Sequence, residues 1–135
     1  MKFFLFILPF AAYAFPITPN VPGDYCTPQN PDFKEYRYAE QIPVCTRNVS
    51  LARKDSICKK VGVTDRTDFT IDHIIPLSLG GSNSDTNLWC QHKSLNVTRE
   101  EYTQYLEVSK GLKTQAEARK YLLGLKFGSV CSPFF

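Results

Sequence analysis

The sequence has few long hydrophobic runs, and the one clear run lies at the N-terminus. Met1-Lys2 is followed by FFLFILPFAAYA. A positive start, a short apolar run and small residues at its end are the layout of a secretory signal peptide. The run is too short to be a comfortable membrane anchor, and no other stretch is long enough to span a bilayer. We therefore expect residues 1–14 to be removed, and residues 15–135 to be secreted or periplasmic and free of the membrane.

Paired C-x-x-C motifs are absent, although the chain has five cysteines. Structural zinc sites commonly use such pairs, so zinc explains these cysteines poorly. An exported protein meets an oxidising compartment, where disulfide bonds form and persist. We expect disulfides among the cysteines, and the odd count leaves one thiol over. The spacing does not fix the pairing of Cys26, Cys45, Cys58, Cys90 and Cys131.

The sequence also lacks the strongly basic balance of many DNA-binding proteins. The formal net charge is +3 for the whole chain, and removal of Lys2 would lower it by one. Charge therefore gives only weak support for a nucleic-acid partner. Internal repeats and low-complexity segments are absent as well, and the length suits one compact domain, which we expect to be a monomer.

What the sequence does have is concentrated in residues 71–96, IDHIIPLSLGGSNSDTNLWCQHKSLN. The β-branched and aromatic residues of FTIDHII at 69–75 predict a short buried strand. The Gly- and Ser-rich segment 80–85 predicts a loop, after which a second apolar run can pair back on the first as a hairpin. Asp72 and His73 then lie at a strand end that faces the loop. Such a pair needs partners if it is buried, and taken alone it would suit a core His bonded to a backbone carbonyl and an Asp that caps the loop.

The order and spacing of the polar residues favour a more specific interpretation. Asp72-His73, the Gly-Gly loop, Asn87 and Asn96 resemble the motif of the HNH, or ββα-metal, nuclease superfamily. The likeness is closer to small secreted bacterial HNH proteins with an IDH-IPL-GGSN-NLW string, and it covers about a quarter of the chain. The resemblance implies an α+β fold: a ββα-metal finger with flanking helices and a disulfide-tethered irregular N-terminal arm. The arm would span residues 15–44, and the HNH nuclease domain residues 45–135.

The resemblance implies a role for each motif residue. His73 matches the general base, and Asn87 matches the central Asn that fixes the loop and the orientation of that His. Asp72 and Asn96 match metal ligands. An imidazole can take a proton from water near neutral pH. Carboxylate and amide oxygens suit one hard divalent cation, for which we expect Mg²⁺, with Mn²⁺ as the alternative.

Other residues near Asn96 are weaker candidates. Glu100 lies four residues later, where colicin-type relatives place another metal ligand, and a helix would put both residues on one face. An ordinary solvated pair is the alternative for Glu100. Arg99 and Lys93 are candidate phosphate contacts, with Arg99 placed roughly where relatives carry a Lys. His92 is more typical of a surface residue or a substrate contact than of a metal ligand.

The flanking segments predict three helices and an irregular arm. A Ser cap predicts a helix over about 51–60, and two Thr capping signatures predict helices over about 98–109 and 114–123. Gly124 should stop the last helix. The Pro-rich segment from residue 15 to about residue 38 should have little regular structure, with a cysteine tying it down.

The resemblance thus implies a secreted, metal-dependent endonuclease that hydrolyses phosphodiester bonds of DNA, with RNA as the other candidate substrate. Nothing in the chain resembles a base-reading module, so we expect sequence-nonspecific cleavage. One alternative is a non-catalytic nucleic-acid-binding HNH module, which should have lost the His or a metal ligand. The other is a disulfide-stapled secreted interaction protein, whose hairpin should bind no divalent metal.

Overall fold

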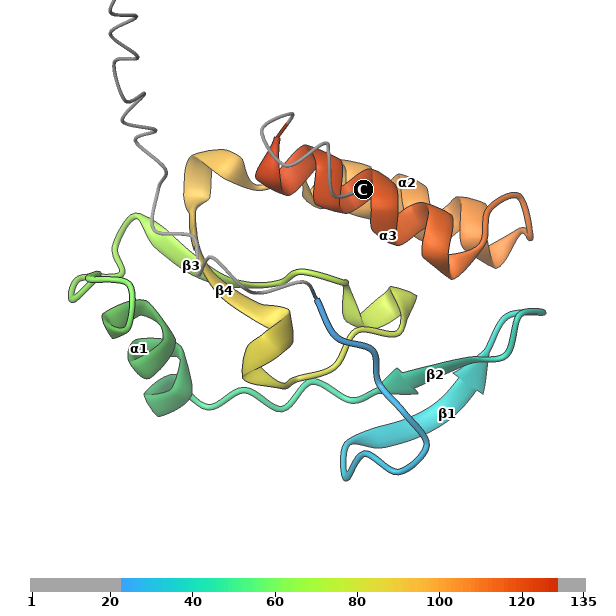
Figure 1. Cartoon of the computed structure of the whole chain (residues 1–135), viewed down its shortest axis with the longest axis horizontal. Helices are drawn as coiled ribbons and strands as arrows, with labels where there is room; N and C mark the ends of the chain where they lie inside the picture. Colours follow the sequence, from blue (N-terminus) through green and yellow to red (C-terminus); the bar gives the residue numbers. More distant parts are fainter. Residues whose placement is uncertain (1–22, 129–135) are drawn as a thin grey trace, which may run out of the picture.

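The computed structural model describes residues 23–128, which form two small antiparallel hairpins and three α-helices (Figure 1). The expected signal peptide, the start of the arm and Cys131 lie outside these residues. Within the described part, no helix is long and apolar enough to span a bilayer. The elements in chain order are β1 (Phe33–Arg37), β2 (Ile42–Cys45), α1 (Leu51–Lys59), β3 (Phe69–His73), β4 (Leu88–His92), α2 (Thr98–Ser109) and α3 (Gln115–Phe127). Short 3-10 turns occupy Leu77–Leu79, Asp85–Asn87 and Lys93–Leu95.

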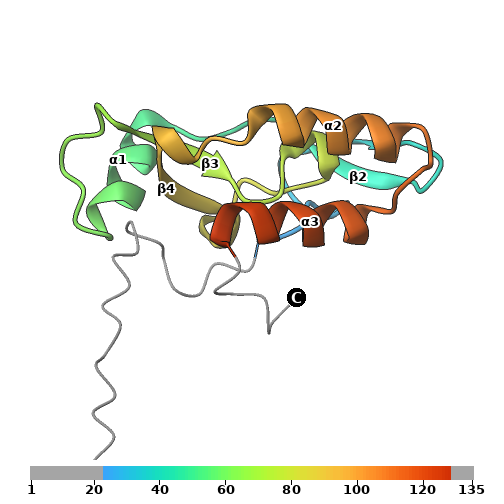
Figure 2. The same ribbon diagram turned by 90° about the horizontal axis from the view of Figure 1, so that it is seen from above.

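The β3–β4 hairpin followed by α2 is the predicted ββα unit. The strands pair antiparallel, and the register sets Asp72 opposite Trp89 and His73 opposite Leu88. Helix α1 packs against this hairpin through Ile57, which joins Leu88 in a buried apolar cluster. Figure 2 shows α2 and α3 running side by side, with α1 at the other end of the molecule. The α+β fold predicted from the sequence is therefore confirmed.

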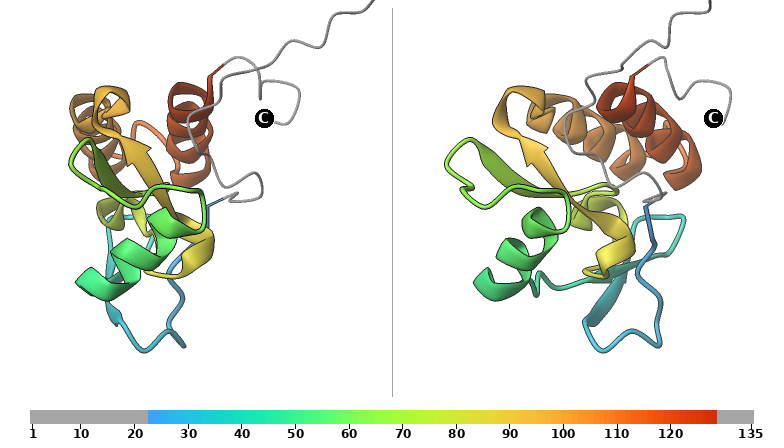
Figure 3. Two further views of the ribbon diagram at one scale, coloured as in Figure 1. Left: turned by 90° about the vertical axis from the view of Figure 1, so that its left-hand side faces the viewer. Right: turned by 60° about the vertical axis from the view of Figure 1, so that its left-hand side comes forward.

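The prediction of an irregular segment up to about residue 38 is wrong for its last part. Strand β1 pairs with β2 in an antiparallel hairpin, and Tyr36 lies opposite Pro43. Ile42 and Val44 on β2 are buried in the main apolar cluster, so tertiary packing favours the hairpin despite the prolines nearby. The polar, exposed sequence of β1 carries little strand signal of its own. Figure 3 shows this hairpin below α2 and α3, which contribute Val108, Ala118 and Leu122 to the same apolar cluster.

Helix α3 is longer than predicted, because it continues through Gly124 to Phe127. A glycine inside a helix costs only about 1 kcal/mol relative to alanine. That cost is offset by the residues on either side, since Leu123 and Lys126 are both buried against the rest of the protein. Gly128 follows with a positive φ of 69°. The other two helices match their predicted bounds to within one residue.

Two disulfides are present among the described residues, as the cysteine content predicts. Cys26–Cys45 joins the N-terminal segment to the end of β2, with the two Cα atoms 5.7 Å apart. Cys58–Cys90 joins the end of α1 to β4, with a Cα separation of 5.1 Å. The covalent links therefore fasten the N-terminal segment to the β1–β2 hairpin, and α1 to the ββα unit.

Candidate functional site

A cavity of about 610 Å³ lies between the β1–β2 hairpin, the β3–β4 hairpin and the start of α2. Three segments that are far apart in the sequence form its wall. The polar residues that line it are Lys34, Arg37, Thr46, Arg47, Thr70, Asp72, His73, Ser78, Gln91, Asn96, Thr98 and Glu101.

The structure brings three of the predicted site residues together at this cavity. Asp72 and His73 come from the end of β3, and Asn96 comes from the turn just before α2. His73 is buried, Asp72 is partly buried and Asn96 is exposed. A strand end and the turn before a helix, separated by more than twenty residues, thus supply an imidazole, a carboxylate and an amide to one space.

The other predicted residues lie elsewhere. Asn87 is fully buried in the loop behind the cavity. Glu100, Arg99 and Lys93 are not among the residues that line it, whereas Glu101 is. The reason is that Asn96 precedes the helix, which begins at Thr98, so the i, i+4 relation of an α-helix does not extend from Asn96 to Glu100.

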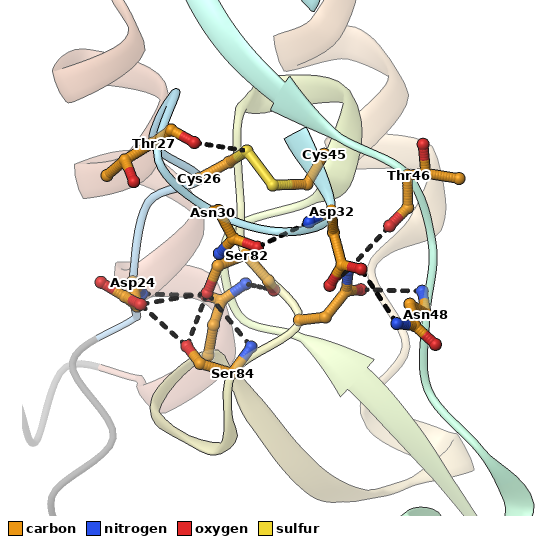
Figure 4. The surroundings of a disulfide bond; sticks show 12 residues. Asp24, Cys26, Thr27, Asn30, Asp32, Cys45, Thr46, Asn48, Ser82 and Ser84 are labelled. Carbon is orange, nitrogen blue, oxygen red and sulfur yellow. Dashed lines mark hydrogen bonds between the residues drawn. A yellow bond between two sulfur atoms is a disulfide. The ribbon is translucent and has the colours of Figure 1, made fainter. Parts of the chain in front are cut away.

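Asn83 holds the ring of His73, and its side chain has a fixed orientation. The amide nitrogen of Asn83 donates to Oδ2 of Asp32 at 3.0 Å and to the carbonyl oxygen of Thr46 at 2.7 Å. Both partners are acceptors, so the nitrogen must face them and the oxygen must face the other way. That oxygen accepts the backbone N–H of Asn48 at 3.2 Å. Figure 4 shows Asp32, Thr46 and Asn48 gathered beside the Cys26–Cys45 disulfide.

The fixed amide determines which nitrogen of His73 carries the proton. Nε2 of His73 lies 3.0 Å from Oδ1 of Asn83, and an amide oxygen can only accept. Nε2 therefore donates, and in the neutral ring Nδ1 is left with the lone pair. Burial lowers the pKa of His73 below its ordinary value, the bond to Asn83 opposes this effect, and the Arg47 cation adds to it. A lowered pKa favours the neutral imidazole, in which Nδ1 is the one basic nitrogen.

Asn87 fastens the loop that follows His73. Its amide nitrogen donates to the carbonyl oxygens of Ile75 and Ser82, and its amide oxygen accepts the backbone N–H groups of Ile75 and Asp24. The loop is tight because Gly81 packs directly against the backbone of Ile75. A Cβ atom on Gly81 would lie 1.8 Å from the Ile75 carbonyl oxygen. Asn87 thus connects the loop to its surroundings, whereas the contact to the His73 ring comes from Asn83.

The Asp72 carboxylate is held through one of its two oxygens. Oδ2 accepts the indole N–H of Trp89 at 2.8 Å and lies 2.8 Å from the ammonium of Lys126. The same ammonium lies 2.9 Å from Oε1 of Glu101. Burial raises the pKa of Glu101, with Lys126 opposing the rise and Asp72 adding to it. Within the described residues both contacts of Asp72 use Oδ2, so Oδ1 is left for the cavity.

The cavity offers carboxylate and amide oxygens, which are the ligand types that a hard divalent cation prefers, but it offers few of them. Residues 23–128 contain no cluster of three or more His, Cys, Asp and Glu side chains that could hold a metal ion. Asp72 offers Oδ1, and Asn96 offers an amide oxygen that also accepts the backbone N–H of Thr98 at 2.8 Å. Mg²⁺ is commonly held by one or two carboxylates and keeps several waters, so such a sparse oxygen set is compatible with it.

Three residues of the site were not identified from the sequence. Asn83 lies in the GGSN string, which indicates a loop and forms part of the resemblance but gives Asn83 no role of its own. Glu101 lies in the first turn of α2, where the sequence shows only a capping signature. Lys126 lies in the last turn of α3, beyond the predicted end of that helix, and no motif surrounds it. Only tertiary structure brings Glu101 to the cavity, Asn83 to His73 and Lys126 to Asp72.

Comparison with known proteins gives one match. Residues 56–93 match the family described as HNH endonuclease. The matched segment runs from the end of α1 to just past β4, so it contains Asp72, His73 and Asn87 but not Asn96. No curated protein and no solved structure matches the chain. The ββα unit and the motif residues at its cavity agree with this match, which supports membership of the HNH superfamily.

Proposed function

We propose that this protein is a secreted, metal-dependent endonuclease that hydrolyses the phosphodiester bonds of DNA, with RNA as the second candidate substrate. One observation carries the proposal. His73 lines the same cavity as Asp72 and Asn96, and its Nε2 is bonded to Asn83, so the basic Nδ1 is the nitrogen left to act. A base and oxygen ligands in one hollow are what phosphodiester hydrolysis by a metal-assisted route requires.

Each residue of the site has a separate proposed role. Nδ1 of His73 takes the proton from the attacking water, while Asn83 keeps the ring oriented through Nε2. Asp72 and Asn96 hold a divalent cation, with Mg²⁺ the expected ion and Mn²⁺ the alternative. When bound, that cation stabilises the additional negative charge on the phosphate. Asn87 acts indirectly by fixing the loop that follows His73.

Cationic side chains at the cavity support a polyanionic substrate. Lys34 and Arg37 on β1, and Arg47 just after β2, all line the hollow. Arg37 is paired with Glu35, whose carboxylate lies 2.7 Å away, whereas Lys34 and Arg47 are exposed. These groups can bind phosphates on either side of the scissile bond. Because phosphate contacts position a nucleic acid without reading its bases, cleavage should be sequence-nonspecific.

Two further features bear on the proposed secretion of the protein and on its oligomeric state. Disulfides fasten both hairpins of the described part, which is expected of a protein that folds in an oxidising compartment. The N-terminal pattern of residues 1–14 fits a signal peptide, and the remaining chain would act as a soluble monomer. Size-exclusion chromatography of the oxidised mature chain measures the oligomeric state.

Degradation of polymer substrates tests the function. Supercoiled plasmid and single-stranded RNA are incubated with the oxidised chain of residues 15–135 in the presence of Mg²⁺, Mn²⁺ or EDTA. We expect cleavage with either metal and none with EDTA, and the polymer cut faster is the substrate. Asp72→Asn should lower the rate at subsaturating metal more than at saturating metal. A folded protein that cuts neither polymer with any metal contradicts the proposal and favours a non-catalytic HNH module.

A further inference from the structure

The buried ammonium of Lys126 lies inside a cage of oxygen atoms. Its Nζ lies 2.8 Å from Oδ2 of Asp72 and 2.9 Å from Oε1 of Glu101. It also donates to the carbonyl oxygens of His73 at 2.8 Å and Ile74 at 2.9 Å. The Lys126 side chain is fully buried, so no water shell replaces these partners.

Two carboxylates and two carbonyls around one positive charge are the surroundings of a bound cation. A desolvated charge is tolerated only when it is paired and its donors are satisfied, and this ammonium meets both conditions. Its three N–H donors have four oxygen acceptors within reach. Nothing in the proposed catalytic roles uses Lys126, yet it contacts a cavity-lining carboxylate on each of two elements, β3 and α2.

We propose that Lys126 is a positioning residue that serves as a tethered cation. It holds Asp72 and Glu101 together in place of a metal ion, and it brings the ends of β3, α2 and α3 to one point. The two carboxylates are then arranged before any divalent ion arrives. Oδ2 of Asp72 is committed to Lys126 and Trp89, so a divalent ion is restricted to Oδ1. This last consequence rests on the proposed function, whereas the cage itself does not.

Because Lys126 takes the place of a metal ion, the protein should fold without divalent metal. Removal of the Lys126 charge should leave a site that a metal ion can occupy. In Lys126→Ala the cage keeps its four oxygens, two of them carboxylates, and loses its cation. Carboxylate and carbonyl oxygens are the ligands that Ca²⁺ and Mn²⁺ accept. The variant should therefore gain a metal site that the wild-type protein lacks.

Thermal unfolding measures whether a metal ion can replace the Lys126 charge, and it needs no nuclease assay. In EDTA, Lys126→Ala should melt lower than wild type by at least about 10 °C, because one partner of a buried ion pair has been removed. Millimolar Ca²⁺ or Mn²⁺ should recover a large part of that loss in the variant and shift wild type little. Lys126→Met, which lacks the charge but fills the space with a hydrocarbon chain, should lose stability and show no recovery.

Lys113→Ala is the matched control. Lys113 also pairs with a glutamate, Glu107, at 2.8 Å, but it is partly exposed and lies away from the cavity. Its removal should change the melting temperature by only a few degrees and create no metal response. Equal metal responses in the Lys113 and Lys126 variants, or none in Lys126→Ala, would overturn the proposal.

A measurement on the wild-type protein covers the case in which the Lys126 variants fail to fold. A buried, hydrogen-bonded ammonium exchanges its protons slowly and gives a ¹H–¹⁵N NMR signal that exposed lysines do not. We expect one such Nζ signal in the metal-free protein, and we expect it to persist when Mg²⁺ is added to saturation. Loss of the signal on adding Mg²⁺ would mean that the metal displaces Lys126, and its absence throughout would mean that the cage does not form.

Discussion

Nε2 of His73 lies 3.0 Å from the side-chain oxygen of Asn83, which is itself fixed by donation of its amide hydrogens to Asp32 and Thr46. The state of the proposed base is thus set by a residue from the loop and by two residues from the other hairpin. Outer partners of this kind commonly matter by about 10- to 100-fold when they orient a reactive group. That range comes from partners of metal-ligating residues, and we apply it to Asn83 as the partner of the proposed base, His73.

Asn83→Ala should lower kcat by about 10- to 100-fold with little change in KM, because the imidazole loses the acceptor that selects its tautomer. Steady-state cleavage of plasmid measures both constants, and circular dichroism verifies the fold. An Asn83→Ala protein with wild-type kcat would remove Asn83 from the mechanism.

Alanine substitutions at two glycines should change the free energy of unfolding in opposite directions. Gly81→Ala places a Cβ atom 1.8 Å from the Ile75 carbonyl oxygen, so the loop must move, and we expect a loss of about 3 kcal/mol or more in the free energy of unfolding. Gly124→Ala lies inside α3 with no atom within 4 Å of its Cβ. It should stabilise the protein by about 0.5–1 kcal/mol. Urea denaturation of both variants checks the pair, and a neutral Gly81→Ala would contradict the described loop packing.

The two disulfides should differ in their effect on activity. Removing either by a double Cys→Ser change should lower the free energy of unfolding by about 3 kcal/mol. Cys26–Cys45 also adjoins Thr46, whose carbonyl oxygen holds Asn83. Its loss should therefore lower kcat of the folded fraction, whereas loss of Cys58–Cys90 should mainly lower stability. Assays well below each variant's melting temperature separate the effects, and equal kcat values in the two variants would argue against the link to His73.

Arg47 should contribute to substrate binding. Arg47→Ala removes an exposed cation from the cavity wall, so KM should rise and the dependence of KM on salt should weaken by about one unit of log–log slope. Arg66→Ala is the control, because Arg66 pairs with Asp55 at 2.7 Å and does not line the cavity. A larger effect on KM from Arg66 than from Arg47 would place the phosphate path elsewhere.

Local sequence signals predicted the ββα unit, α1 and α2 because strand composition, capping residues and a glycine loop act over a few residues. They failed at the β1–β2 hairpin, where the burial of Ile42 and Val44 decides the structure. They also failed at the end of α3, where the contacts of Lys126 outweigh a helix-breaking glycine. Both errors concern residues whose partners are distant in the sequence.

The candidate site also combines residues that local motifs predict with residues that only long-range contacts bring in. Asp72, His73 and Asn96 were identified from motif spacing, and the structure places them at one cavity. Glu101 and Lys126 were not identified, because nothing in the sequence relates the first turn of one helix to the last turn of another. The pairing of cysteines could not be predicted for the same reason, since it depends on which elements pack together.

The most direct test of the central claim compares His73→Ala with His92→Ala, the chain's other histidine. His92 does not line the cavity and packs edge-on against Phe69. Single-turnover cleavage of plasmid with saturating Mg²⁺ should fall by about 10²- to 10⁴-fold in His73→Ala, the range for loss of a general base, and by little in His92→Ala. A His73→Ala protein that cleaves at the wild-type rate would contradict the account.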